Sequence, residues 1–215
     1  MAVALAGSLA GPTVVLAKAP PRLSKEMKRQ VVAVVPPRKM HTRGERVASQ
    51  VHQPMAGFDD ETYPAEFGER AAALLSKPPL TWKVTVLDPG EAFYDAVETD
   101  DPDDDPATTL TALPADLGEA AYLAVFRYAE LAYAVHEQPA ETSSGKLEIE
   151  RSVKLTLDLQ LVIYDAATGE PLGTFDAETP VMVPELLPPD PKGMPYYRAT
   201  GATLRKMART VAREG

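Results

Sequence analysis

The stretch "VKLTLDLQLVIYDAATGEPLGTF", residues 153–175, contains the strongest secondary-structure pattern of the chain. Apolar residues occupy every second position from Val153 to Leu161, and polar residues occupy the positions between them. Successive side chains of a β-strand point to opposite faces of a sheet. An alternation of this length therefore predicts a strand with one buried face and one hydrated face.

A tight turn follows this strand. We expect the carboxylate of Asp165 to accept hydrogen bonds from backbone N–H groups two or three residues later, and Gly169 to adopt a positive φ. The chain then returns as a second strand, "PLGTFDAETPVMV", residues 171–183. These roles explain Asp165, Thr168 and Glu170 as turn residues, so we do not interpret them as catalytic groups.

The segments on either side of this hairpin extend the predicted sheet. Residues 122–135, "YLAVFRYAELAYAV", predict a third long strand, which gives a three-strand antiparallel meander. Residues 196–214 predict a C-terminal helix that docks on the sheet. Its apolar face consists of Tyr197, Leu204, Met207, Ala208 and Val211.

The first half of the chain predicts a βαβ-like start. Residues 31–35, "VVAVV", favour a strand covered on both faces, and residues 82–86 favour a second strand that ends at a turn. A helix between them is indicated by Phe67, Ala71, Leu74 and Leu75, which share one helical face. A short helix is expected over 114–121. The predicted fold class is therefore α+β, a mixed β-sheet with a βαβ-like start, the meander and the C-terminal helix.

Length and composition favour one folded domain. The 215 residues include 45% hydrophobic and 25% charged residues, which is typical of a globular chain. The 21 prolines lie mainly between the apolar segments, as loop residues do. We interpret residues 31–215 as a single α+β domain with an acidic loop at 98–107, and residues 20–30 as a basic linker that contains proline.

The N-terminal residues 1–19 resemble a secretory signal peptide. An apolar run of small residues is followed by Ala17-Lys18-Ala19, which resembles a cleavage site. We therefore expect an exported, periplasmic protein that starts near Pro20. The alternative is a cytoplasmic protein in which this run is an ordinary strand, or a short anchor that gives membrane association only if the segment is retained.

Charge is segregated along the chain, which has a formal net charge of −9. Residues 18–46 contain nine Lys or Arg, whereas residues 87–119 contain eleven Asp or Glu and no Lys or Arg. An acidic loop whose charges repel one another stays accessible to a basic protein partner, or to a basic segment of a second copy. The candidate partner-binding residues are Asp100, Asp101, Asp103, Asp104 and Asp105. A solubilising loop is the alternative. Nucleic acid is not an expected partner, because no aromatic residues accompany the basic clusters.

The sequence indicates no catalytic, metal or cofactor site. Cysteine is absent, and the three histidines have no metal-ligand spacing. Asp101, Asp103 and Asp105 are spaced as in a calcium loop, but Pro106 stands where that loop requires glycine. A set of five tyrosines permits either a ligand-binding aromatic wall or half-buried packing residues, and we favour packing. These are Tyr122, Tyr128, Tyr133, Tyr196 and Tyr197.

The order of segments and the phrase "DAATGE" at 165–170 resemble bacterial periplasmic proteins of the CsgG/LpoB/TolB-N-terminal type. The matching pieces are "VVAVVPP", "PAEFGERAAALLSK", "WKVTVLDP" and "ADLGEAAYLAVFRYAEL", so the resemblance spans residues 31–183. It implies a non-enzymatic, exported cell-envelope accessory protein that acts through protein–protein contacts. The alternatives left open are a glycan- or peptide-binding module and an enzyme whose site is dispersed in the sequence.

Overall fold

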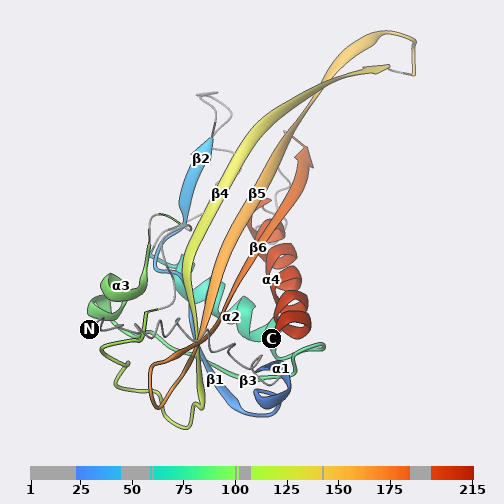
Figure 1. The fold of residues 1–215 in the computed structure, drawn as a ribbon. Coiled ribbons are helices and arrows are strands. Elements are labelled where there is room, and N and C mark those ends of the chain that lie inside the picture. Colours follow the sequence, from blue (N-terminus) through green and yellow to red (C-terminus); the bar gives the residue numbers. More distant parts are fainter. Residues whose placement is uncertain are drawn as a thin grey trace, which may run out of the picture.

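The computed structural model describes residues 23–44, 59, 61–99, 101, 108–141, 143–184 and 195–215. These residues form one mixed sheet with helices packed against it (Figure 1), which confirms the α+β class. The helices are α1 (Leu23–Glu26), α2 (Tyr63–Leu75), α3 (Glu91–Val97) and α4 (Pro195–Glu214). The strands are β1 (Val31–Val35), β2 (His41–Gly44), β3 (Lys83–Val86), β4 (Tyr122–Glu141), β5 (Leu147–Asp165) and β6 (Pro171–Pro184).

The sheet has a parallel and an antiparallel part. Its described strands follow the order β3-β1-β4-β5-β6, and β2 pairs with residues 130–133 in the middle of β4. Strand β1 is parallel to both β3 and β4, as the predicted βαβ start requires for its first two strands. Strands β4, β5 and β6 form the predicted antiparallel meander, with Leu159 opposite both Ala129 and Ala177.

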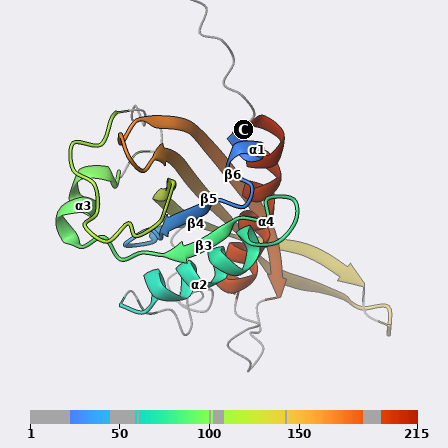
Figure 2. The same ribbon diagram turned by 90° about the horizontal axis from the view of Figure 1, so that it is seen from below.

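Both faces of the sheet bury apolar residues. On one face, Leu155, Leu157, Leu159 and Leu161 of β5 are fully buried beneath α2 and α4. They pack together with Phe67, Leu204 and Met207. On the other face, α3 and the residues before β4 cover a smaller cluster that includes Phe93, Leu123 and Val162. Figure 2 shows α3 and α4 on opposite sides of the central strands. The alternation over 153–161 thus directs one set of side chains into the main core. The other face of the sheet is apolar only at its lower end.

The structure differs from the sequence-based expectation at three places, one predicted helix and two elements that were not predicted. Residues 114–121 form turns and not a helix, because Gly118 has a φ of +55°, a backbone conformation incompatible with the right-handed helix. The helix that does precede β4 is α3, where Phe93 and Val97 lie one turn apart and are buried. Strand β2 was not predicted, since "HTRG" has no apolar pattern.

The folded domain also begins before residue 31. Leu23 in α1 and Met27 just after it are buried in the main core, so these residues of the predicted linker at 20–30 belong to the domain. Burying Met27 completely removes a large side chain from water, which stabilises the N-terminal attachment. The predicted signal peptide, residues 1–19, lies outside the described residues.

Candidate functional site

The acidic loop begins at the edge of the smaller cluster. The backbone N–H of Thr99 donates to the carbonyl of Arg127 in β4 at 3.2 Å, which fixes the start of the loop on the sheet. The Thr99 hydroxyl donates to the Asp101 carbonyl at 2.8 Å, and Asp101 is exposed. Asp100, Asp103, Asp104 and Asp105 lie outside the described residues.

The turn at Asp165 has the geometry expected from the sequence. Oδ1 of Asp165 accepts hydrogen bonds from the N–H of Ala167 at 2.8 Å and of Thr168 at 3.0 Å. Gly169 has a φ of +73°. Asp165 and Gly169 therefore make the turn as expected, and the Thr168 hydroxyl accepts a hydrogen bond from the N–H of Glu170 at 3.2 Å.

The tyrosines do not form one wall. Tyr196 and Tyr197 are in the first turn of α4, and the Tyr197 hydroxyl donates to the carboxylate of Glu66 in α2. The guanidinium of Arg70 lies 4.1 Å from the centre of the Tyr197 ring and donates to its carbonyl at 2.6 Å. On the opposite face, Tyr128 stacks on His41. These contacts join elements of the fold, as the packing interpretation expects.

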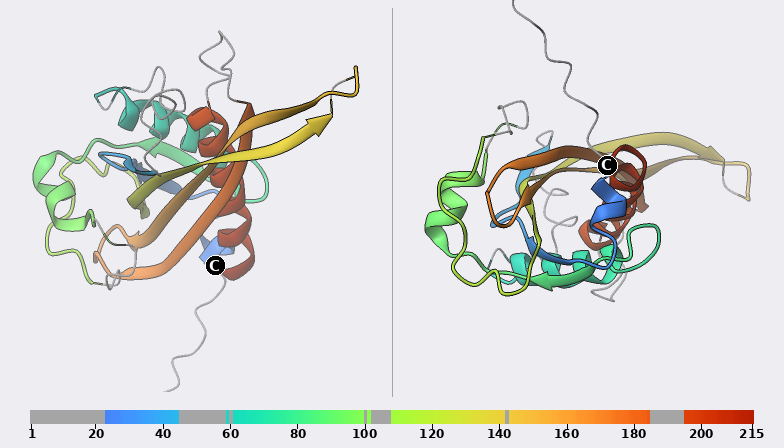
Figure 3. Two further views of the ribbon diagram at one scale, coloured as in Figure 1. Left: turned by 90° about the horizontal axis from the view of Figure 1, so that it is seen from above. Right: turned by 60° about the horizontal axis from the view of Figure 1, so that its bottom comes forward.

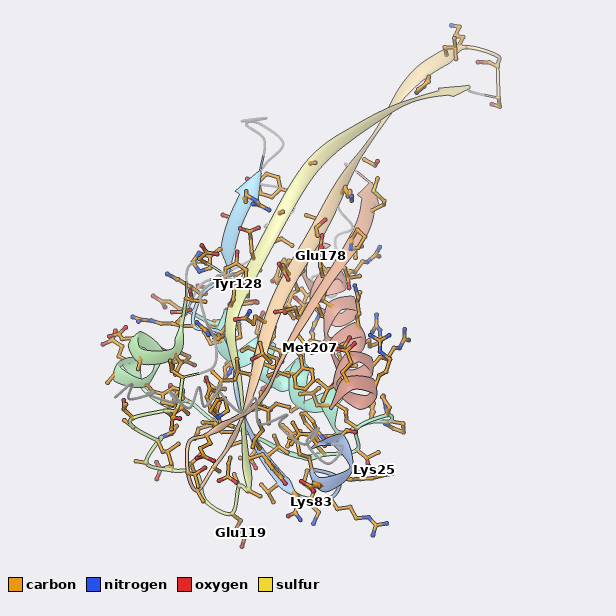
Figure 4. All side chains as sticks on the ribbon, in the orientation of Figure 1. Lys25, Lys83, Glu119, Tyr128, Glu178 and Met207 are labelled. Carbon is orange, nitrogen blue, oxygen red and sulfur yellow. The ribbon has the colours of Figure 1, made fainter. Side chains whose placement is uncertain are left out.

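A polar row crosses the open face of the sheet. Glu130, Asp158 and Glu178 lie opposite one another on β4, β5 and β6. Figure 4 shows Tyr128 and Glu178 at this level of the sheet. Partial burial and the nearby carboxylates Glu178, Asp176 and Glu130 raise the pKa of Asp158. Burial and a hydrogen bond to Glu130 raise the pKa of Tyr128 to about 12. Among the described residues, no group of three or more acidic or histidine side chains has the arrangement of a metal site.

A groove lies at the carboxyl ends of β1 and β3. Its volume is about 370 Å³, and its walls are Pro36, the first turn of α2 at Pro64 and Ala65, and Val86 and Leu87 at the end of β3. Tyr94 of α3 closes one side, and Glu61 and Asp88 are exposed at the rim. In open α/β sheets ligands bind outside the carboxyl ends of parallel strands, which makes this groove a candidate binding site.

A smaller polar pocket of about 220 Å³ shares Tyr94 with the groove. Arg38 lies in it and forms ion pairs with Glu91 at 2.9 Å and Asp95 at 3.1 Å. Burial raises the pKa of Glu98, and the nearby cations of Lys39 and Arg38 partly oppose this effect. Because Arg38 is already paired, the pocket offers little uncompensated charge to a ligand.

A two-stranded β-ribbon, which we call the arm, projects from the end of the sheet. It consists of residues 137–141 of β4, residues 147–151 of β5 and the turn residues 143–146, and it extends past the ends of β2 and β6. Figure 3 shows the arm projecting clear of the helices, on the side away from α3. Leu147 at its tip is 78% exposed.

Sequence reasoning did not find the groove or the arm. The groove combines residues from four separate segments, and no local pattern connects them. The arm had a weak signal, because a predicted strand of 14 residues is already longer than most strands. Within the described part of the chain, no helix is long and apolar enough to cross a membrane.

No known protein family matches this chain, and no curated protein matches it in sequence. Two solved structures are similar in outline. One is the hypothetical protein CT253 from Chlamydia trachomatis, with 14% identity over 86% of this chain and 96% of that chain, at a TM-score of 0.39. The other is a putative neuraminyllactose-binding hemagglutinin homolog from Helicobacter pylori, with 10% identity over 87% and 88% of the two chains, at a TM-score of 0.36. Similarity at these scores assigns no function to the chain.

Proposed function

We propose that this protein is a non-enzymatic accessory protein of the cell envelope that acts through protein–protein contacts made by the arm. The observation that supports the proposal is the projection of the arm beyond every other described element. The resemblance to CsgG/LpoB/TolB-N-terminal proteins motivates the envelope assignment, and the N-terminal sequence motivates export.

The edges of the arm are available for pairing. In the arm, β4 pairs only with β5, so each strand has one edge without a neighbouring strand among the described residues. Such edges present backbone N–H and C=O groups that another chain can bind by strand addition. Pro139 is exposed and has no N–H group, which limits uncontrolled pairing along part of β4.

An isolated two-stranded ribbon gains little stability from its own contacts, so its presence favours a role in binding. A two-stranded hairpin is only marginally stable in water, and the arm has no helix packed against it in the described part of the chain. Leu147 places a large apolar side chain at the tip, where only a partner would bury it. These features favour a contact that orders the arm when a partner binds.

Site-specific photo-crosslinking in the native host tests the proposal. A photoreactive amino acid replaces Leu147 at the arm tip, and a matched variant carries it at Ala73, which is exposed on α2. We expect an envelope protein to crosslink from position 147 and not from position 73. The same crosslinked proteins from both positions, or none from position 147, would contradict the proposal.

The same cells test export. N-terminal sequencing of the mature protein is expected to begin at or near Pro20. An intact Met1 on protein recovered from the cytoplasm would contradict export, while leaving the crosslinking result at the arm to be judged separately.

A further inference from the structure

The groove lies beside the outer edge of strand β3, which is the edge strand of the described sheet. Lys83 and Leu87 donate their backbone N–H groups toward β1, to the carbonyls of Gln30 at 3.2 Å and Val34 at 2.9 Å. Because these groups alternate along a strand, the N–H and C=O groups of Val84 and Val86 face the other edge. No described strand pairs with that edge of β3.

The groove has apolar walls and an acidic rim. Of the residues that line it, Glu61 and Asp88 are acidic and none is basic. Val86 lies both on the wall and on the unpaired strand, and its side chain is 39% exposed. A segment that pairs with β3 would therefore place apolar side chains against Val86 and cationic side chains near the rim.

We propose that β3 and the groove bind an extended basic segment of a partner protein, in which apolar residues alternate with lysine or arginine. The segment adds as a new strand beside β3. Main-chain hydrogen bonds to Val84 and Val86 hold it in place, and the groove accepts every second side chain. This site is separate from the arm, so it extends the proposed function to a second contact surface.

Binding of synthetic peptides to the purified protein tests the proposal. The probe is a fluorescein-labelled octapeptide that alternates lysine and valine, and the matched control alternates glutamate and valine. We expect the lysine peptide to bind with a Kd below about 1 mM and the glutamate peptide to bind at least about tenfold more weakly. Equal binding of the two peptides, or no binding of the lysine peptide, overturns the proposal.

Backbone methylation of the peptide distinguishes strand addition from simple charge attraction. One isomer carries N-methyl groups on every lysine and the other on every valine. Only one of these two sets of N–H groups can face β3. We expect one isomer to bind like the parent peptide and the other to lose about tenfold or more in affinity. Equal affinities of the two isomers exclude strand addition.

Two protein variants locate the site. Glu61→Gln with Asp88→Asn removes both rim charges and keeps the Asp88 position able to accept from the N–H of Gly90. We expect about fivefold weaker binding. Asp116→Asn with Glu119→Gln removes two exposed charges elsewhere, and Figure 4 shows Glu119 at the lower end of the molecule. This control should bind as the unmodified protein does.

Amide hydrogen exchange gives a readout that needs no variant. The amides of Val84 and Val86 should exchange more slowly when the lysine peptide is bound, because their N–H groups become hydrogen-bonded. Unchanged exchange at both positions, or equal weakening of binding by the two double variants, overturns the assignment of the site. These measurements on the purified protein do not involve the arm. A negative crosslinking result at position 147 would therefore leave them unchanged.

Discussion

At the scale of single residues, Gly169 is required for two reasons. Its φ of +73° is strained for any residue with a side chain. A Cβ at this position would also lie 2.9 Å from the carbonyl oxygen of Leu110, whose N–H donates to the Gly169 carbonyl at 2.9 Å. The turn between β5 and β6 therefore packs closely against Leu110, in the segment that precedes β4.

We expect Gly169→Val to destabilise the protein by about 2 kcal/mol or more, because a β-branched residue resists positive φ and collides with Leu110. Equilibrium urea unfolding measures the change. Asp165→Asn is the matched control, since its side-chain oxygen still accepts from the N–H groups of the turn. A Gly169→Val protein as stable as the control would contradict this account.

At the scale of elements, the row Glu130–Asp158–Glu178 places like charges opposite one another on adjacent strands. Burial, then repulsion from Glu178, Asp176 and Glu130, raises the pKa of Asp158 in the folded protein above its unfolded value. The folded state therefore binds more protons, so stability falls as the pH rises from the unfolded pKa near 4 through the folded pKa.

We expect Asp158→Asn to stabilise the protein by a few tenths of a kcal/mol at pH 7, as removal of a like charge in a cross-strand row does. The gain should shrink as the pH falls through the raised pKa of the folded protein, and it should be absent below about 4, where the aspartate is neutral in both states. Thermal unfolding of both proteins across this pH range measures the effect. A gain that is constant with pH would show that charge is not its cause.

The packing of α2 on β3 depends on Gly68. A Cβ on this residue would lie 2.6 Å from Cγ1 of Val86, so the glycine permits the close approach of helix and strand that shapes one end of the groove. Glycine inside a helix costs about 1 kcal/mol relative to alanine. Close packing and helix propensity therefore oppose each other at this position.

A double-mutant cycle separates these two effects. Gly68→Ala alone should leave stability unchanged or lower it, whereas Gly68→Ala in a Val86→Ala background should stabilise by about 1 kcal/mol. The difference between the backgrounds measures the collision with Val86. A coupling energy near zero in denaturant unfolding would mean that the helix shifts without cost.

At the scale of the whole molecule, the acidic loop and the arm are parts of the surface that the core does not require. Asp101 is exposed, and the loop starts from a backbone contact on β4. Attraction between exposed charges is screened over about 10 Å at 0.1 M salt, so an acidic loop affects mainly the rate at which a basic partner associates.

Replacing Asp100, Asp101, Asp103, Asp104 and Asp105 by asparagine should leave the melting temperature within about 3 °C of that of the unmodified protein. Association with the partner captured at position 147 should become slower and less dependent on salt. Stopped-flow binding at several salt concentrations measures both. An unchanged association rate at low salt would show that the loop only aids solubility.

Local sequence patterns were enough to predict several parts of the fold. The alternation from Val153 to Leu161 determined a half-buried strand, and the helical spacing of Phe67, Ala71 and Leu75 determined α2. Asp165 and Gly169 determined the turn, because turn hydrogen bonds and φ involve only a few consecutive residues. Asp101 could be predicted to be exposed from its charged surroundings.

Features that depend on contacts between distant segments could not be predicted in this way. His41 to Gly44 form a strand because the backbone of β4 offers hydrogen-bonding groups beside them, with His41 opposite Glu130, and not because of their own sequence pattern. The projection of the arm depends on where β2 and β6 end. The groove joins Pro36, Pro64, Val86 and Tyr94. Such sites arise from packing between elements, and the residues that meet there carry no shared local signal.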